Sequence, residues 1–291
     1  MKRHFTLCLV TAVIAVVGCQ EKHQTTTKGN IRILVGESVF PLVQKEVAEF
    51  MRLYERANIE ISPTTSREAI IQLLTGKVAT IIVSRELNEE EKTAVEEYKL
   101  PVRSWPFAMD AVVIAINAKN EVSRITYDQA RDVFSGRLRN WKHLGGATQA
   151  IDPFVLSRNS GTSEFFLNTV VHDTMFAETA KRCSTSVQLV GIIGARPSAI
   201  GVVGLAWVNG GVKPLSVAIN DTSAFVAPYQ ASIYQGEYPL RRKIYIMSTD
   251  TGYAGLAHGF VTFLTSAQGQ KIVRDSGLVP VTMPVKIVRF Q

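Results

Sequence analysis

Short, largely apolar runs alternate along the chain with segments whose apolar residues recur at helical spacing. Residues 31–35 form a short apolar run, which predicts a strand. In residues 42–54, apolar side chains recur every three or four positions with charged residues between them, which predicts an amphipathic helix. Further strands are expected at 59–62, 78–83, 111–116, 154–156, 200–208, 244–246 and 279–281. Further helices are expected at 67–74, 86–98, 126–134, 164–171, 258–265 and 267–275. This alternation predicts an α/β fold with mostly parallel sheets.

The N-terminus departs from this pattern and predicts an export signal. Lys2 and Arg3 precede a run of about 13 mostly apolar residues, whereas a membrane-spanning helix needs about 20. The run ends at Gly18 and Cys19, which resembles the lipobox of bacterial lipoproteins, where the cysteine thiol takes the lipid. We therefore expect a lipoprotein signal peptide at 1–18, and a lipidated Cys19 with a flexible polar tether over 19–30. The alternative is a short apolar anchor with an incidental cysteine.

Composition limits the class of protein. The chain of 291 residues is 46% hydrophobic and 20% charged, so it can bury a large core, which excludes disorder, collagen and small disulfide scaffolds. Removal of residues 1–18 lowers the net charge from +7 to +5. This diffuse excess permits an anionic ligand or an anionic membrane surface but gives no argument for nucleic acid. Cys183 would then be the one unmodified cysteine, which excludes an intramolecular disulfide and favours a small hydrophobic role.

Three junctions between a loop and a predicted helix carry hydroxyl groups. They are Ser38, residues 64–66 and residues 160–163. Backbone N–H groups at a helix N-terminus hold anions, and in open α/β sheets such loops gather at the carboxyl ends of the strands. Arg158 stands two residues before Ser160 and can clamp an oxyanion with two hydrogen bonds. Alternatively these residues only cap their helices, so the pattern alone predicts an anion-binding α/β protein and nothing more.

Several segments together resemble one family. Residues 157–166, SRNSGTSEFF, look like the Arg-x-x-Ser-Gly-Thr phosphate loop of the phosphate-binding proteins of ABC phosphate importers. That family lies within the type II periplasmic-binding-protein superfamily. The resemblance extends from about Ile31 to Val281, nearly the whole mature chain. The other segments typical of the family are 125–146, 198–208, 238–246 and 263–273.

The resemblance implies ligand-binding residues in each of two lobes. In the second lobe, the residues that match the phosphate loop are Arg158, Ser160, Gly161 and Thr162. In the first lobe, the residues that match the loop with backbone N–H and hydroxyl contacts to phosphate are Ser38, Val39 and Phe40. Ser66, in preference to Arg67, matches a further donor hydroxyl. Arg158 is expected to be the main charge-neutralising contact with the ligand.

Other positions depart from the family pattern. Ser84 falls at or near a position where some members have an aspartate that accepts the proton of the ligand. Asp110, just before the strand 111–116, is the nearest acid that can take this role. The alternative for Asp110 is a strand-end cap or a surface charge. Val39 stands where threonine is common, and residues 64–67 lack the usual glycines, so a shifted oxyanion specificity stays open.

The fold that the resemblance implies is α/β and two-lobed, a type II periplasmic-binding-protein fold in which each lobe is a mixed sheet flanked by helices. Lobe one comprises 31–112 and 244–291, and lobe two comprises 113–243. The expected crossings between the lobes are 111–116 and 241–246. The ligand lies in the cleft between the lobes, and hinge closure buries it. We expect a monomer without cofactor or metal ion, since the sequence has no metal-ligand cluster.

Three functions are compatible with these residues. The first is an extracytoplasmic, lipid-anchored protein of the cell envelope that captures inorganic phosphate and delivers it to an ABC permease complex. The second is a protein that binds or senses another oxyanion, such as sulfate, molybdate or arsenate, without a transport role. The third is a serine hydrolase or phosphatase that uses Ser160, but the sequence has no Gly-x-Ser-x-Gly elbow. Because the histidines His143, His172 and His258 also stand singly, we expect no enzyme.

Overall fold

The computed structural model describes residues 24–173, 175–250, 252 and 254–281. The predicted signal peptide, Cys19 and the last ten residues of predicted lobe one lie outside the described residues. Within the described part of the chain, no helix combines the length and the apolar character needed to cross a bilayer.

One mixed sheet extends through the molecule, with its main strands in the order β2-β1-β3-β11-β4-β8-β6-β7. Their bounds are β1 Gly29–Gly36, β2 Ala57–Thr64, β3 Thr80–Val83, β4 Arg103–Asn117, β6 Asp152–Leu156, β7 Lys181–Cys183, β8 Ala199–Gly204 and β11 Arg241–Ser248. β1, β2 and β3 are parallel, and so are β8, β6 and β7, but β11 and β4 are antiparallel to their neighbours in this order. The predicted α/β fold is confirmed. The prediction of mostly parallel sheets is wrong at the centre, because the chain crosses there once in each direction.

The structure also contains four short strands, most of which the sequence does not predict. β12 (Val279–Pro280) and β9 (Val212–Pro214) pair with β4, and β5 (Arg124–Thr126) pairs with β10 (Ser216–Ala218) in a separate sheet. Of these, only β12 coincides with a predicted strand. Cys183, at the end of β7, is buried, and its burial raises the pKa of the thiol above the ordinary value.

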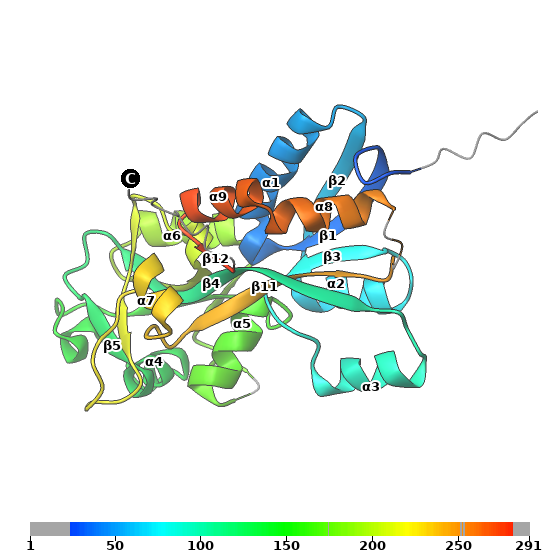
Figure 1. Cartoon of the computed structure of the whole chain (residues 1–291). Coiled ribbons are helices and arrows are strands. Elements are labelled where there is room, and N and C mark those ends of the chain that lie inside the picture. Colours follow the sequence, from blue (N-terminus) through cyan, green and yellow to red (C-terminus); the bar gives the residue numbers. More distant parts are fainter. Residues whose placement is uncertain (1–23, 174, 251, 253, 282–291) are drawn as a thin grey trace, which may run out of the picture.

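The helices lie at both ends of this sheet. Their bounds are α1 Phe40–Leu53, α2 Ser66–Leu74, α3 Glu89–Glu97, α4 Tyr127–Phe134, α5 Gly161–Phe166, α6 Ser186–Ala195, α7 Gln230–Gln235, α8 Leu256–Thr265 and α9 Ala267–Asp275. Single turns are η1 Glu37–Val39, η2 Trp141–Leu144, η3 Leu167–Val171 and η4 Leu205–Trp207. Figure 1 shows α1, α8 and α9 grouped beside β1, while α4, α5, α6 and α7 gather toward the other end of β4 and β11.

The side chains that begin the helices explain several boundaries. Thr65, followed three residues later by Glu68, has the sequence form of a capping box, in which each side chain bonds the backbone N–H of the other residue. The Thr65 hydroxyl accepts the expected hydrogen bond from the N–H of Glu68 at the start of α2. The second bond of that predicted capping box is absent from α2, where the Glu68 carboxylate accepts from Gln72. Full capping boxes form at α3, between Asn88 and Glu91, and at α4, between Thr126 and Gln129. The box at α3 makes this helix begin later than expected.

Buried side chains form separate cores at the two ends of the sheet. One cluster contains residues from Ala111 to Leu240, with Val279, and another contains residues 33–108 together with 244–278. A third, smaller cluster lies beneath α2. The change from one core to the next falls within β4 and β11, the strands that Figure 1 shows running across the middle of the molecule. These cores support the predicted lobe boundaries, which stay a prediction.

The segment predicted as a tether contacts the folded domain from residue 24 onward. Gly29 and Asn30 belong to β1 and pair with Ala57 and Asn58 of β2. The backbone of Thr26 also approaches α8 so closely that a Cβ on Gly259 would lie 1.8 Å from its carbonyl oxygen. Glycine is therefore the residue that lets this segment lie on the helix. Residues 24–30 of the predicted tether therefore belong to the folded domain. Residues 19–23 lie outside the described residues.

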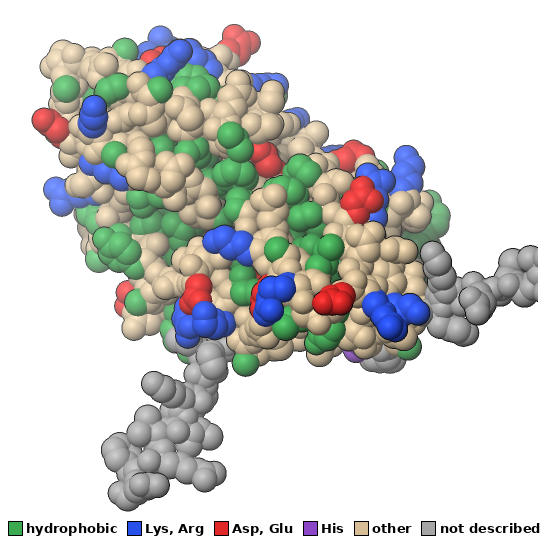
Figure 2. All heavy atoms as spheres, turned by 90° about the horizontal axis from the view of Figure 1, so that it is seen from above, with side chains coloured by type: hydrophobic (Ala, Val, Ile, Leu, Met, Phe, Trp, Pro, Cys, Tyr) green, Lys and Arg blue, Asp and Glu red, His purple; other side chains and the backbone are tan. Residues whose placement is uncertain are grey.

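Charged side chains are dispersed on the surface. Figure 2 shows Lys and Arg interspersed with Asp and Glu on the face seen from above, with apolar side chains between them. This face therefore has no continuous basic track of the kind that binds nucleic acid.

One acidic side chain lies on the buried face of α1. Glu46 is completely inaccessible to solvent, and neither carboxylate oxygen has a hydrogen-bond partner among the described residues. Burial raises the pKa of this carboxyl from 4.5 to about 9. The folded protein therefore holds a proton here between these two pH values, whereas the unfolded chain has already lost it.

We expect the free energy of unfolding to fall by about 4 kcal/mol between pH 5 and pH 8.5 because of Glu46, since each pH unit between the two pKa values is worth about 1.4 kcal/mol. The stabilising proton is bound most favourably at the acidic end of this window and is lost as pH rises toward the pKa of the folded state. Urea unfolding at both pH values should show this fall in the parent and a smaller one in Glu46→Gln. Equal pH dependence in the two proteins would contradict the prediction.

Candidate anion-binding site

Three serine hydroxyls come together at the carboxyl ends of β1, β2 and β3. Ser38 lies in η1 just after β1, Ser66 is the first residue of α2, and Ser84 follows β3. All three are buried, and the Oγ atoms of Ser38 and Ser84 are 3.1 Å apart. Because these strands are parallel, their carboxyl ends share one edge of the sheet, where open α/β proteins bind ligands.

The start of α5 packs directly against these hydroxyls. A Cβ on Gly161 would lie 2.5 Å from the Oγ of Ser66 and 3.1 Å from the Oγ of Ser84. Glycine is thus required for this close approach. Ser160 caps the helix, since its Oγ accepts a hydrogen bond from the N–H of Thr162 at 3.2 Å. Two loops that are more than 70 residues apart in the chain therefore meet here, as the sequence predicts.

The crossing strands add an ion pair that no pattern in the sequence predicts. Arg242 of β11 stands opposite Asp110 of β4 in the strand register, and both side chains are almost completely buried. Oδ2 of Asp110 accepts from Nη2 of Arg242 at 2.7 Å and from its Nε at 3.1 Å. The same Nη2 donates to Oγ1 of Thr162 at 3.2 Å, which joins the ion pair to the start of α5.

Asp110 is therefore neither a surface charge nor a simple strand-end cap. Besides Arg242, it accepts a hydrogen bond from the N–H of Leu205 on Oδ1, at 3.3 Å. A Cβ on Gly204 would lie 3.4 Å from Nη2 of Arg242 and 3.0 Å from the carbonyl oxygen of Ser38. The backbone at Gly204 therefore contacts both the ion pair and the loop that carries Ser38.

Two buried polar atoms of this cluster have no hydrogen-bond partner among the described residues. They are Oγ of Ser66 and Nη1 of Arg242. Buried donors are nearly always paired in folded proteins, because an unpaired donor carries its full desolvation cost. An oxyanion that accepts from both would remove this cost, since both atoms are donors. Asp110 balances the charge of Arg242. Hydrogen bonds from the hydroxyls and the partial positive charge of the helix N-termini would therefore also contribute to the attraction of an anion to this site.

The structure does not place Arg158 in this cluster. The N–H of Ser160 donates to the carbonyl of Ser157, which closes a turn with Arg158 and Asn159 at its tip. A single residue separates Arg158 from Ser160, whereas the family pattern has two. The exposed Arg158 side chain lines a separate hollow of about 140 Å³ with Arg67, Glu164 and Asp173 among other residues. In this structure the arginine that contacts the start of α5 is Arg242, and the role predicted for Arg158 stays a prediction.

The remaining predicted residues lie beside Ser38. Val39 is buried in the core under α1, with only its backbone available for a ligand. The N–H of Phe40 donates to the carbonyl of Glu37 and closes η1, so it is already used within the protein. The structure thus brings together the hydroxyls, Gly161 and Asp110, adds Arg242, and leaves Arg158 outside.

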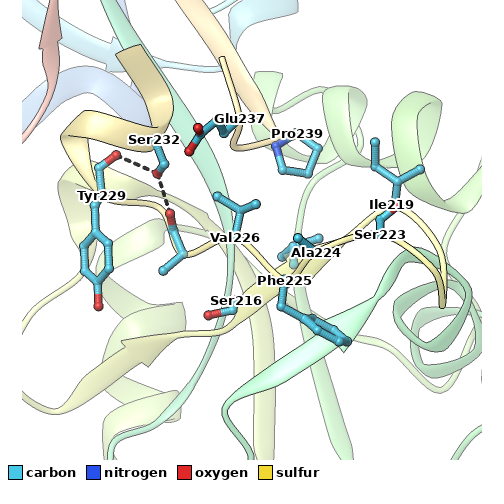
Figure 3. Close-up of a pocket in the computed structure, with 12 residues that line it drawn as sticks. Ser216, Ile219, Ser223, Ala224, Phe225, Val226, Tyr229, Ser232, Glu237 and Pro239 are labelled. Atoms are coloured by element: carbon cyan, nitrogen blue, oxygen red, sulfur yellow. Dashed lines mark hydrogen bonds between the residues drawn. The ribbon is translucent and has the colours of Figure 1, made fainter. Parts of the chain in front are cut away.

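A larger hollow lies away from this cluster, near α7 and β10 (Figure 3). Its volume is about 880 Å³, and Figure 3 shows Phe225, Pro239 and Glu237 among its lining residues. Ser232 is not free there, because its hydroxyl donates to the carbonyl of Tyr229 at 2.9 Å. Neither lysine nor arginine lines this hollow, and its one charged residue is acidic, so its chemistry does not suit an anion.

Comparison with known proteins shows the family to which the chain belongs. The model of the "PBP superfamily domain" matches residues 20–268, well over half of the chain. The chain belongs to the PBP superfamily. This membership and the mixed α/β architecture confirm the predicted fold class.

Relatives within the PBP superfamily include proteins named phosphate-binding protein PstS. The one from Bacillus subtilis is 28% identical, with 92% of this chain and 86% of the relative covered. The one from Pseudomonas aeruginosa is 24% identical, with 95% and 91% covered. A crystal structure of a putative phosphate ABC transporter substrate-binding protein from Clostridium perfringens, with bound phosphate, has a TM-score of 0.79 at 23% identity. That match covers 87% of this chain and all of the Clostridium chain, and it supports the fold. The predicted resemblance to phosphate-binding proteins of ABC importers is confirmed.

Proposed function

We propose that this protein captures inorganic phosphate between its two lobes and delivers it to an ABC importer. The observation that carries the proposal is the buried cluster of Ser38, Ser66, Ser84, Gly161 and Arg242, in which two donors lack a partner among the described residues. The relatives' name, phosphate-binding protein, supports phosphate as the oxyanion.

Phosphate discrimination in this proposal depends on Asp110. Phosphate near neutral pH keeps at least one proton, whereas sulfate keeps none. A carboxylate has about four lone-pair sites, and Asp110 uses three of them in the contacts with Arg242 and Leu205. It can therefore accept one further hydrogen bond from a protonated ligand. Against sulfate, two acceptors would face each other in a desolvated site, which is unfavourable.

Calorimetry with phosphate, arsenate, sulfate and molybdate tests this function. We expect phosphate and its close analogue arsenate to bind and sulfate to bind far more weakly. Equal binding of sulfate would instead favour the second function, an oxyanion-binding or sensing protein without proton discrimination. No binding of any of the four anions would contradict both.

The proposal assigns Ser160 a binding role and no catalytic one. Its hydroxyl oxygen accepts the N–H of Thr162 as a helix cap. A nucleophilic serine needs an adjacent base within hydrogen-bond reach, and Ser160 has no such contact within the described residues. Hydrolysis of a phosphate ester by the purified protein would overturn this assignment.

We further propose that the mature protein works as a monomer outside the cytoplasm, held to the membrane by lipid on Cys19, with an ABC permease as its partner. The charged start, the short apolar run and the Gly18-Cys19 pair support the anchor.

Replacement of Cys19 by alanine is expected to move the protein from the membrane fraction to the soluble fraction, because the thiol that takes the lipid is lost. Fractionation of cells that express the parent or Cys19→Ala measures this, with Cys183→Ala as the matched control that should stay membrane-bound. Retention of Cys19→Ala in the membrane would disprove the anchor.

A further inference from the structure

Arg85 joins α3 to α5, the helix whose first residue packs against the anion-binding cluster. It follows Ser84 directly and forms two hydrogen bonds with Glu91 of α3, from Nη1 at 2.7 Å and from Nη2 at 2.8 Å. Its Nε lies 2.8 Å from Oε2 of Glu164 on α5. The three side chains are between 12% and 27% exposed, so water screens the ion pairs only in part.

Glu37 makes a second connection of this kind. Its carboxylate accepts the N–H of Ser186, the first residue of α6, and its backbone carbonyl accepts the indole N–H of Trp207 at 3.1 Å. A carboxylate at a helix N-terminus is favoured because of the partial positive charge there. Burial raises the pKa of this carboxyl, while the bond from Ser186 acts in the opposite direction.

Both connections run between the predicted lobes and flank the anion-binding residues. Arg85 is next to Ser84 and Glu37 is next to Ser38, both in 31–112. Their partners Glu164 and Ser186 are in 113–243. By contrast, the bonds between Arg85 and Glu91 stay within the first lobe, so they hold the guanidinium in place whether the lobes are together or apart.

We propose that the contacts of Arg85 with Glu164 and of Glu37 with Ser186 form a two-point latch that holds the lobes closed and slows the release of the bound anion. This inference rests on the proposed function and deepens it. None of the four residues belongs to the buried hydroxyl cluster. The latch therefore acts after the anion has entered, and its loss should change the dissociation rate more than the association rate.

The test uses Glu37→Gln, Glu164→Gln and the double variant in the mature protein. Glutamine keeps the size of each side chain and removes its charge. The matched control is Glu89→Gln, which breaks an exposed ion pair with Lys92 within α3. Stopped-flow kinetics with inorganic phosphate should show dissociation about 3–10 times faster in each single variant and faster again in the double variant. Association should stay within about twofold, and Glu89→Gln should match the parent.

An unchanged dissociation rate in the double variant would overturn the latch, and so would an equal increase in Glu89→Gln. Circular dichroism of each variant confirms that it is folded before kinetics are compared. If the parent binds no phosphate, the proposed function fails, and small-angle scattering of the ligand-free proteins then decides the latch. A larger radius of gyration in the double variant than in the parent supports it, and identical scattering overturns it.

Discussion

Replacing Arg242 by methionine should weaken phosphate binding at least about 100-fold, because two charge-assisted hydrogen bonds of about 1.5–3 kcal/mol each are lost. Arg242 is the cationic side chain in contact with the hydroxyl cluster, and its Nη1 is a buried donor without a partner among the described residues. Methionine keeps much of the length and removes every donor. Isothermal titration with phosphate measures the effect.

The matched control is Arg158→Met, which removes the same charge from the exposed turn before Ser160. Its dissociation constant should stay within about threefold of the parent value, as for a screened surface charge. If Arg158→Met instead weakened phosphate binding and Arg242→Met left it unchanged, Arg158 would be the main charge contact, as the sequence pattern predicts. Arg242→Met alone leaves the charge of Asp110 buried without a partner, which can destabilise the fold. The double variant Asp110→Asn/Arg242→Met removes both charges, so a loss of phosphate binding in it is not caused by an unpaired buried charge.

Replacing Asp110 by asparagine should lower the free energy of unfolding by about 3–5 kcal/mol, because it leaves the buried Arg242 without its counter-ion. The exposed fraction of the side chain is 3% for Arg242 and 0% for Asp110, so water cannot replace the lost partner. Urea unfolding measures the change. Asp152→Asn, which breaks the exposed pair of Asp152 with Lys181, is the control and should cost less than about 1 kcal/mol.

A small effect of Asp110→Asn on stability would show that Arg242 is solvated or paired elsewhere.

The same variant tests discrimination between oxyanions at a temperature where it is folded. Sulfate binding should improve relative to phosphate, because the acceptor that repels sulfate is gone. A constant ratio would leave Asp110 with the sole role of positioning Arg242.

Local patterns predicted those parts of the fold whose period is visible in the sequence. The amphipathic α1 was expected almost to the residue, whereas α6 was missed. Residues 186–195 are apolar on nearly every face and include Gly191 and Gly194, so neither a polar stripe nor helix propensity identifies them. β4 was found only in its second half, because Ser104, Pro106 and Asp110 interrupt its apolar run.

The site was predictable where it is built from loops that precede helices. Ser38, Ser66 and Gly161 each carry a local signal, and the structure brings them together. Arg242 carries only a weak one, as the buried member of the alternating run Arg241, Arg242 and Lys243. Its partner Asp110 is 132 residues away in the chain, and the antiparallel register that joins them cannot be derived from one sequence.

For a protein held by lipid on Cys19, as proposed, the contact of Thr26 with α8 would limit the distance between the folded domain and the bilayer. With lipid on Cys19, five residues separate the membrane from the first described residue. Fully extended, they span less than about 20 Å, roughly half the reach of the twelve-residue tether expected from sequence. The binding protein would then stay within one domain diameter of the lipid, with α8 on its membrane side, and reach a permease by diffusion in the plane of the membrane. Meeting the permease in two dimensions raises their effective concentration without any stronger contact between them.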